Sequence, residues 1–182
     1  VEKLTQTQYS QPALFVIEYA TAKLLDSWGI KAQAYIGHSI GEYVAAALAE
    51  VFTLSDALRL VIRRGQIMQS VTTGSMVAVP LSADQLLTRM GDDLSIAVIS
   101  EPNMCVVSGP VDCMRLFIQN CEQDNINCFP LHTSHAFHSM MMDEILDDFS
   151  QVINTVNLSV PGIPFISNVT GNWITDQQAI DP

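Results

Sequence analysis

Positive charge is scarce in this sequence. Its 182 residues include 8 Lys and Arg against 19 Asp and Glu, which gives a formal net charge of −11 at pH 7. This balance argues against a nucleic-acid partner, because such binding depends on Lys and Arg that neutralise phosphates. An anionic substrate would have to be held by one or two placed cations, so each arginine is a candidate binding residue.

Long apolar runs are also missing. No run approaches the roughly 18 to 20 apolar residues that a membrane-spanning helix needs. Residues 1–6 lack the basic-then-apolar order of a secretory signal. We therefore expect a soluble, cytoplasmic protein with no membrane partner. The 48% hydrophobic and 15% charged residues favour a folded core over disorder.

Cysteines are few, and their spacing does not suggest a metal site. None of the four forms a Cys-x-x-Cys pair with another. We expect free thiols and no bound metal. The positions are Cys105, Cys113, Cys121 and Cys128.

The most informative motif is Gly-x-Ser-x-Gly at 37–41, where an apolar stretch ends and an alanine-rich helical pattern begins. This setting predicts a nucleophile elbow that exposes the hydroxyl of Ser39. Gly37 and Gly41 would let the strand and the helix cross without side-chain collision. The backbone N–H of Ile40, at the start of the helix, would supply half of an oxyanion hole. The short Gly-x-Ser-x-Gly pattern also occurs by chance, so the catalytic interpretation needs a candidate base elsewhere in the sequence.

The remaining pattern predicts an α/β protein. We expect an α/β-hydrolase-like core with a parallel sheet, formed by residues 1–71 and 133–182. Residues 72–132 would form an inserted ferredoxin-like subdomain, because short strands alternate there with helices in the β-α-β-β-α-β order of a split βαβ unit. The expected strands are 76–80, 95–99, 104–107 and 128–131, and the expected helices are 83–90 and 110–123.

Histidine is the residue type most often used as a general base, and three of the chain's four histidines lie close together in the sequence. The residue pattern does not choose between His135 and His138. The alternative for each is a structural histidine bonded to the backbone, and we favour that alternative for His132 and His38.

Five stretches together carry a resemblance to a known family. They are 9–15, 37–42, 64–69, 106–109 and 135–139. The sequence resembles the malonyl-type acyltransferase domain of modular polyketide synthases, which is related to malonyl-CoA:acyl carrier protein transacylase. The resemblance implies transfer of a malonyl unit from coenzyme A to the phosphopantetheine thiol of an acyl carrier protein, in polyketide or fatty acid biosynthesis. It implies neighbouring synthase domains such as ketosynthase, and no bound cofactor.

The resemblance also assigns roles to residues. Ser39 matches the acyl-accepting nucleophile, and His138 matches the catalytic base of a Ser-His dyad with ping-pong kinetics. Arg64 matches the residue that binds the free carboxylate, for which its planar fork is suited and lysine is not. An arginine at this place could instead be a solvated charge at a helix end. We adopt that interpretation for Arg63. The other substrate-binding positions are Gln11, His38, His135, Phe137 and Asn168.

The extender unit is predicted from two features that resemble malonyl-using members. Methylmalonyl-using members carry a smaller residue at the position of Phe137 and tyrosine at that of His135. A bulky ring would leave no room for an α-methyl group. Ile40 after the serine also matches malonyl members. A difference of one methyl group between two substrates usually changes the free energy of transition-state binding by only about 1 to 3 kcal/mol.

The sequence departs from the family at its start. Nothing before Tyr9 matches the Gly-Gln-Gly segment whose region supplies the second oxyanion donor, so we expect an N-terminally truncated domain. Loss of one such donor typically lowers the rate about 100- to 1,000-fold.

Two other functions stay open. A serine esterase or thioesterase would use the same serine and histidine but gives no role to Arg64. A non-catalytic docking domain would keep the motif and bind only its neighbours.

Overall fold

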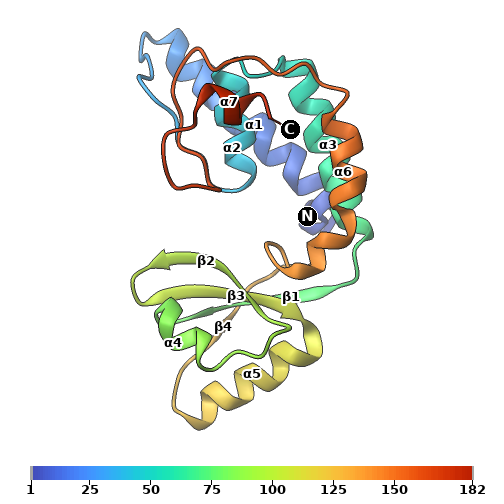
Figure 1. The fold of residues 1–182 in the computed structure, drawn as a ribbon, viewed down its shortest axis with the longest axis vertical. Helices are drawn as coiled ribbons and strands as arrows, with labels where there is room; N and C mark the ends of the chain where they lie inside the picture. Colours follow the sequence, from blue (N-terminus) through green and yellow to red (C-terminus); the bar gives the residue numbers. More distant parts are fainter. Residues whose placement is uncertain (1, 182) are drawn as a thin grey trace. The chain divides into compact units, whose positions relative to one another are not determined.

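The computed structural model of the protein describes residues 2–181. These residues form two compact units. The first unit consists of two chain segments, one that ends at Ile67 and one that begins at Asp147 (Figure 1). The second unit spans Met68–Leu146. The predicted subdomain 72–132 lies inside the second unit, which extends further at both ends. The domain assignment itself stays a prediction.

The first unit is built mainly of helices. Phe15 on α1 and Leu60 on α3 are completely buried in its core. The alanines at 45–47 on α2 are also buried there, and their small side chains let α2 pack closely against α1. The elements are η1 (Glu2–Thr5), α1 (Thr7–Ser27), α2 (Ile40–Leu48), α3 (Leu54–Ser70, continuing past the unit boundary), α6 (Leu146–Ile153) and α7 (Asp176–Ala179).

The predicted parallel sheet is absent from the described residues of the first unit. Only an isolated parallel bridge joins Tyr35 to Phe165, and an isolated antiparallel bridge joins Ile166 to Trp173. A sheet needs several consecutive paired residues on neighbouring strands, and residues 34–36 supply one such residue. The prediction of a sheet at this place is therefore wrong for this part of the chain, whereas the mixed α/β character is confirmed.

The second unit contains a four-stranded antiparallel sheet in the order β2-β3-β1-β4. The β-α-β-β-α-β order of elements is the one predicted for 72–132. Figure 1 shows α4 and α5 on one side of this sheet. The elements are β1 (Gly74–Val79), α4 (Ala83–Leu87), β2 (Ser95–Glu101), β3 (Met104–Pro110), α5 (Val111–Gln123), β4 (Phe129–Pro130) and η2 (Met140–Ile145).

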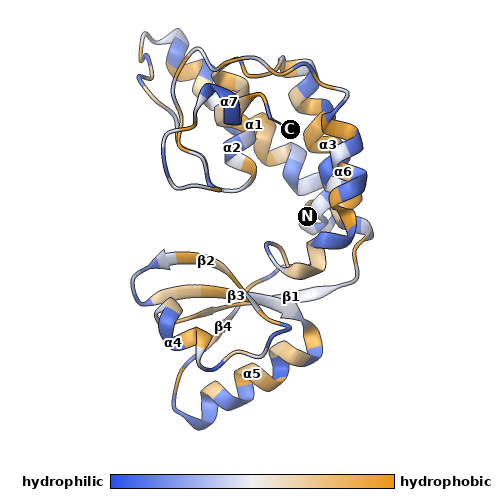
Figure 2. Ribbon diagram, in the orientation of Figure 1, coloured by the Kyte–Doolittle hydropathy of each residue, from blue (hydrophilic) through white to orange (hydrophobic). Residues whose placement is uncertain are grey.

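The core of the second unit lies between its sheet and its helices. Val77 on β1 is paired with Val107 on β3, and both are completely buried. Met114 and Phe117 on α5 pack into the same core, and Figure 2 shows apolar and polar residues on different sides of that helix. All four cysteines are free, as predicted.

Candidate active site

Ser39 occupies a strained backbone position directly before α2. Its φ of 52° and ψ of −114° lie in the region that residues with a side chain rarely adopt. Such a conformation costs about 1 to 3 kcal/mol and persists only where surrounding structure holds it. A strained turn directly before a helix is one feature that a nucleophile elbow requires.

The two glycines of the motif play different parts. A Cβ atom on Gly37 would overlap the backbone of Gly41 and lie 2.5 Å from the backbone nitrogen of Glu42. A Cβ atom on Gly41 would meet only the carboxylate of Glu18, at 3.4 Å. Glycine is therefore required at Gly37, whereas the prediction that Gly41 must also lack a side chain is wrong.

The Gly37→Ala variant is expected to destabilise the intact protein by about 1 to 3 kcal/mol, because the added methyl group forces the backbone of the turn apart. The Gly41→Ala variant is the matched control and is expected to be neutral or slightly stabilising, since alanine is favoured over glycine in a helix by about 0.5 to 1 kcal/mol. Thermal unfolding of both variants measures the difference. Equal stability of the two would contradict the steric argument.

The backbone N–H of Ile40, the predicted oxyanion donor, is not used by the hydrogen bonds of the turn. The N–H of Gly41 donates to His38 O at 2.9 Å, and the N–H of Glu42 donates to Ser39 O at 3.0 Å. The N–H of Ile40, the first residue of α2, has no acceptor among residues 2–181. It therefore stands at the positive end of the helix dipole, where an oxyanion is stabilised.

Asn168 lies against the turn. Its Oδ1 accepts a hydrogen bond from the N–H of Ser39 at 2.9 Å, and its Nδ2 donates to the carbonyl oxygen of Gly37 at 2.6 Å. The parallel bridge between Tyr35 and Phe165 explains this meeting, because parallel segments bring their carboxyl ends to the same edge.

Arg64 is half-buried and lies between two other helices. Its Nη1 donates to Oε1 of Gln11 on α1 at 2.5 Å, and its guanidinium carbon lies 5.4 Å from the ring centroid of Tyr43 on α2. Burial raises the pKa of the Tyr43 hydroxyl, and the charge of Arg64 partly opposes this. The backbone of α3 comes close to α1 at Gly65, where an added Cβ atom would lie 3.0 Å from Thr7 O.

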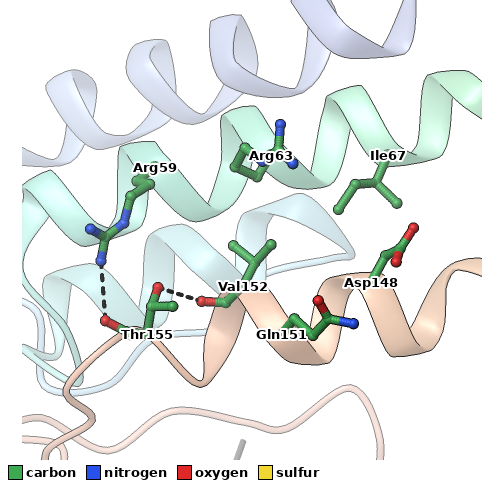
Figure 3. A pocket seen from close by; sticks show the side chains of 7 residues that line it. All are labelled: Arg59, Arg63, Ile67, Asp148, Gln151, Val152 and Thr155. Carbon is green, nitrogen blue, oxygen red and sulfur yellow. Dashed lines mark hydrogen bonds between the residues drawn. The ribbon is translucent and has the colours of Figure 1, made fainter.

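Arg63 has a different environment from its neighbour. Its side chain is exposed, and its Nη1 donates to Oε1 of Gln66 at 2.9 Å. It lines a pocket of about 420 Å³ between α3 and α6, which contains none of the predicted site residues (Figure 3). The other lining residues are Arg59, Ile67, Asp148, Gln151, Val152 and Thr155.

The histidine segment belongs to the second unit. His135 is 1% exposed, and its Nδ1 lies 2.8 Å from Oγ of Ser134. Its ring centroid is 6.0 Å from that of Phe137. His138 is exposed and has a φ of 56°, so it too has a left-handed backbone conformation.

Six of the predicted site residues lie in the first unit and three lie in the second. The first group is Gln11, His38, Ser39, Ile40, Arg64 and Asn168, and the second is His135, Phe137 and His138. His38 and His132 are both exposed.

Two residues near the site were missed by the sequence reasoning. Glu42 is half-buried and accepts the backbone N–H of Asn168 at 3.1 Å, while Tyr43 contacts Arg64. Helical spacing is the signal that could have found them, because residues three and four positions after Ser39 project to the same side of a helix.

The described part of the chain has no helix with both the length and the apolar character needed to cross a bilayer.

Comparison with known sequences places the whole chain in one family. Residues 1–181 match the model of the acyl transferase domain. A phenolphthiocerol/phthiocerol polyketide synthase protein of Mycobacterium tuberculosis is 41% identical over 179 residues, which are 98% of this chain and 12% of that protein. The chain thus spans a small part of this relative's length.

Solved structures agree with the sequence match. The acyl transferase domain of ZmaA superposes with a TM-score of 0.90 at 43% identity, over 100% of this chain and 42% of that one. The malonyl-CoA:ACP transacylase of Synechocystis has a TM-score of 0.85 at 30% identity, over 97% of this chain and 64% of that one. This chain therefore belongs to the acyl transferase domain family of polyketide synthases.

Proposed function

We propose that the chain transfers a malonyl extender unit from coenzyme A, through an ester on Ser39, to the phosphopantetheine thiol of an acyl carrier protein. The observation that carries the proposal is the strained Ser39 beside the open N–H of Ile40, with a half-buried arginine on the neighbouring helix. The carrier protein and a ketosynthase are the proposed partners, since the relatives are polyketide synthases. No cofactor is required.

The chemistry follows from the residue types. His138 takes the proton of Ser39 while the hydroxyl oxygen attacks the thioester carbonyl, and the N–H of Ile40 stabilises the oxyanion. Collapse breaks the carbon–sulfur bond, and His138 returns the proton to the coenzyme A sulfur. The carrier thiol then attacks the carbonyl of the malonyl ester and loses its proton to His138. Collapse breaks the bond between the acyl carbon and the Ser39 oxygen, and His138 returns the proton to that oxygen.

Arg64 is the proposed ligand of the free malonyl carboxylate. One of its five N–H donors is used on Gln11, and its guanidinium carbon lies 5.4 Å from the ring centroid of Tyr43. A guanidinium held by these contacts, with donors remaining, suits bidentate binding of a carboxylate. Gln11 thereby acts on the substrate through the arginine that it orients.

The core of the domain is proposed to be of the α/β-hydrolase-like type. The parallel bridge between Tyr35 and Phe165 supports this, because it precedes the nucleophile turn in the way that a core strand pair would. We retain 72–132 as a ferredoxin-like subdomain, on the basis of its strand order.

The proposal is tested by mass spectrometry of the intact protein after mixing with malonyl-CoA and methylmalonyl-CoA in equal amounts. A malonyl adduct that maps to the peptide containing Ser39 is expected. No adduct from either thioester would contradict acyl transfer, and a mainly methylmalonyl adduct would contradict the assigned extender. Turnover of neutral esters, unaffected by Arg64→Ala, would favour an esterase instead.

Selection against methylmalonyl is assigned to Phe137, whose half-buried ring lies beside that of His135. The Phe137→Ser variant is expected to raise the ratio of methylmalonyl to malonyl adduct about tenfold or more, because one methylene group is worth about 10- to 200-fold in discrimination. The competition between malonyl-CoA and methylmalonyl-CoA, read by mass spectrometry, measures this ratio. The control is Phe129→Ser on β4, an exposed position where the ratio is expected to stay at the wild-type value. An unchanged ratio in Phe137→Ser would contradict the assignment.

A further inference from the structure

The C-terminal segment of the first unit reaches back to the nucleophile turn at Asn168. Asn168 lies in the loop between Phe165 and α7, and that loop meets the start of α2 (Figure 1). It makes three hydrogen bonds there: its side chain accepts from Ser39 N–H at 2.9 Å and donates to Gly37 O at 2.6 Å, and its N–H donates to Glu42 Oε1 at 3.1 Å.

The side-chain contacts require an amide. One atom must accept a hydrogen bond and its neighbour must donate one, and an ionised carboxylate can only accept. Glutamine has the same groups on a longer side chain, which would displace them from the turn. Asparagine is therefore matched to this place in both chemistry and length.

The two contacts lie on either side of the strained residue. Gly37 O belongs to the segment that enters the turn, and Ser39 N–H belongs to the residue whose φ is 52°. The contacts use the N–H of Ser39 and leave that of Ile40 for the substrate. A side chain that spans the turn in this way limits its relaxation to an unstrained conformation.

We propose that Asn168 is a positioning residue, whose side-chain amide holds Ser39 in the conformation that presents its hydroxyl for attack. This role replaces direct substrate contact as its task, and it rests on the proposed function of Ser39 as a nucleophile. Glu42 anchors the backbone of Asn168 from α2, and burial raises the pKa of this carboxyl while the N–H of Asn168 opposes the rise.

The test uses Asn168→Asp. The carboxyl group of this variant has the donor and acceptor of the amide only when it is protonated. Its carboxylate places a second acceptor against Gly37 O, whereas the protonated acid can again donate there and accept from Ser39. The titratable groups of the turn and of α2 are His38, Glu42 and Tyr43. Glu18 on α1 also faces the turn, since its carboxylate lies 3.4 Å from where a Cβ atom on Gly41 would be, and residues 165–175 contain no titratable group. We expect Gly37 O and the carboxylate of Glu42 to raise the pKa of the introduced acid above its ordinary value of about 3.9, against the opposite effect of the Ser39 N–H and of the α2 N-terminus.

The readout is the rate at which a fluorophosphonate labels Ser39 in the intact protein between pH 5 and pH 7.5. At pH 7.5, Asn168→Ala and Asn168→Asp are expected to label about 10- to 100-fold more slowly than wild type, in line with the loss of paired hydrogen bonds. The rate of Asn168→Asp relative to wild type rises as the pH falls, and that of Asn168→Ala stays constant. Asn172→Asp is the control, since its side chain bonds locally to Thr170 O.

The outcomes separate this inference from the proposed function. Wild-type labelling rates in Asn168→Ala, or equal pH profiles for the Ala and Asp variants, would overturn the positioning role. Fluorophosphonate labelling does not depend on the acyl group, so a wild-type protein that labels at Ser39 but takes no malonyl group from coenzyme A would refute only the proposed function.

Discussion

The Ser39→Ala variant is expected to acquire no acyl group from malonyl-CoA. Alanine keeps the Cβ atom and therefore the same backbone strain at φ 52°, so the change removes the nucleophilic oxygen without altering the shape of the turn. Mass spectrometry of the intact protein detects the added malonyl mass in wild type and its loss in the variant.

The matched control for this experiment is Ser55→Ala, an exposed serine in the first turn of α3 that is expected to leave loading at the wild-type level. An adduct of unchanged yield in Ser39→Ala would show that another group accepts the acyl unit. It would also remove the reason for assigning the turn at 37–41 to catalysis.

The Arg64→Ala variant is expected to lower kcat/KM for malonyl-CoA about 10- to 100-fold, because hydrogen bonds to a charged group contribute about 1.5 to 3 kcal/mol. Loading from acetyl-CoA, which lacks the free carboxylate, is expected to change little. Arg64→Lys should recover only part of the loss, since lysine keeps the charge without the planar fork. Steady-state kinetics with both thioesters measure the effect.

Arg63→Ala provides the control on the adjacent residue. Arg63 is exposed, and replacing it is expected to change kcat/KM by no more than about twofold, as is usual for surface positions. An equal loss with malonyl-CoA and acetyl-CoA in Arg64→Ala would contradict carboxylate binding. It would instead mean that the contacts of Arg64 with Gln11 and Tyr43 serve to hold three helices together.

Several features could be predicted from sequence because they depend on residues close together in the chain. The alternation of short strands and helices in 72–132 predicted the order of elements that the second unit has. The Gly-x-Ser-x-Gly pattern predicted a sharp turn before a helix, and Ser39 has the strained φ that such a turn needs. Local periodicity and local sterics are sufficient for both.

Other features depend on residues far apart, and the sequence misjudged or missed them. The pattern at 34–36 predicted a sheet strand, but whether a strand is paired depends on distant segments. Within residues 2–181, the one bridge partner of Tyr35 is Phe165. The pattern also treated the two glycines of the motif alike, although only Gly37 lies against another stretch of backbone.

By itself, the sequence determined the chemistry that this protein can offer: a serine in a tight turn, a helix N-terminus behind it, and an arginine able to bind a carboxylate. Only the tertiary structure decided how these groups are supported. It set Arg64 against Gln11 and Tyr43, and it brought Asn168 to the turn of Ser39. The physical reason is that a side-chain hydrogen bond between residues more than a hundred positions apart produces no periodic pattern in the sequence.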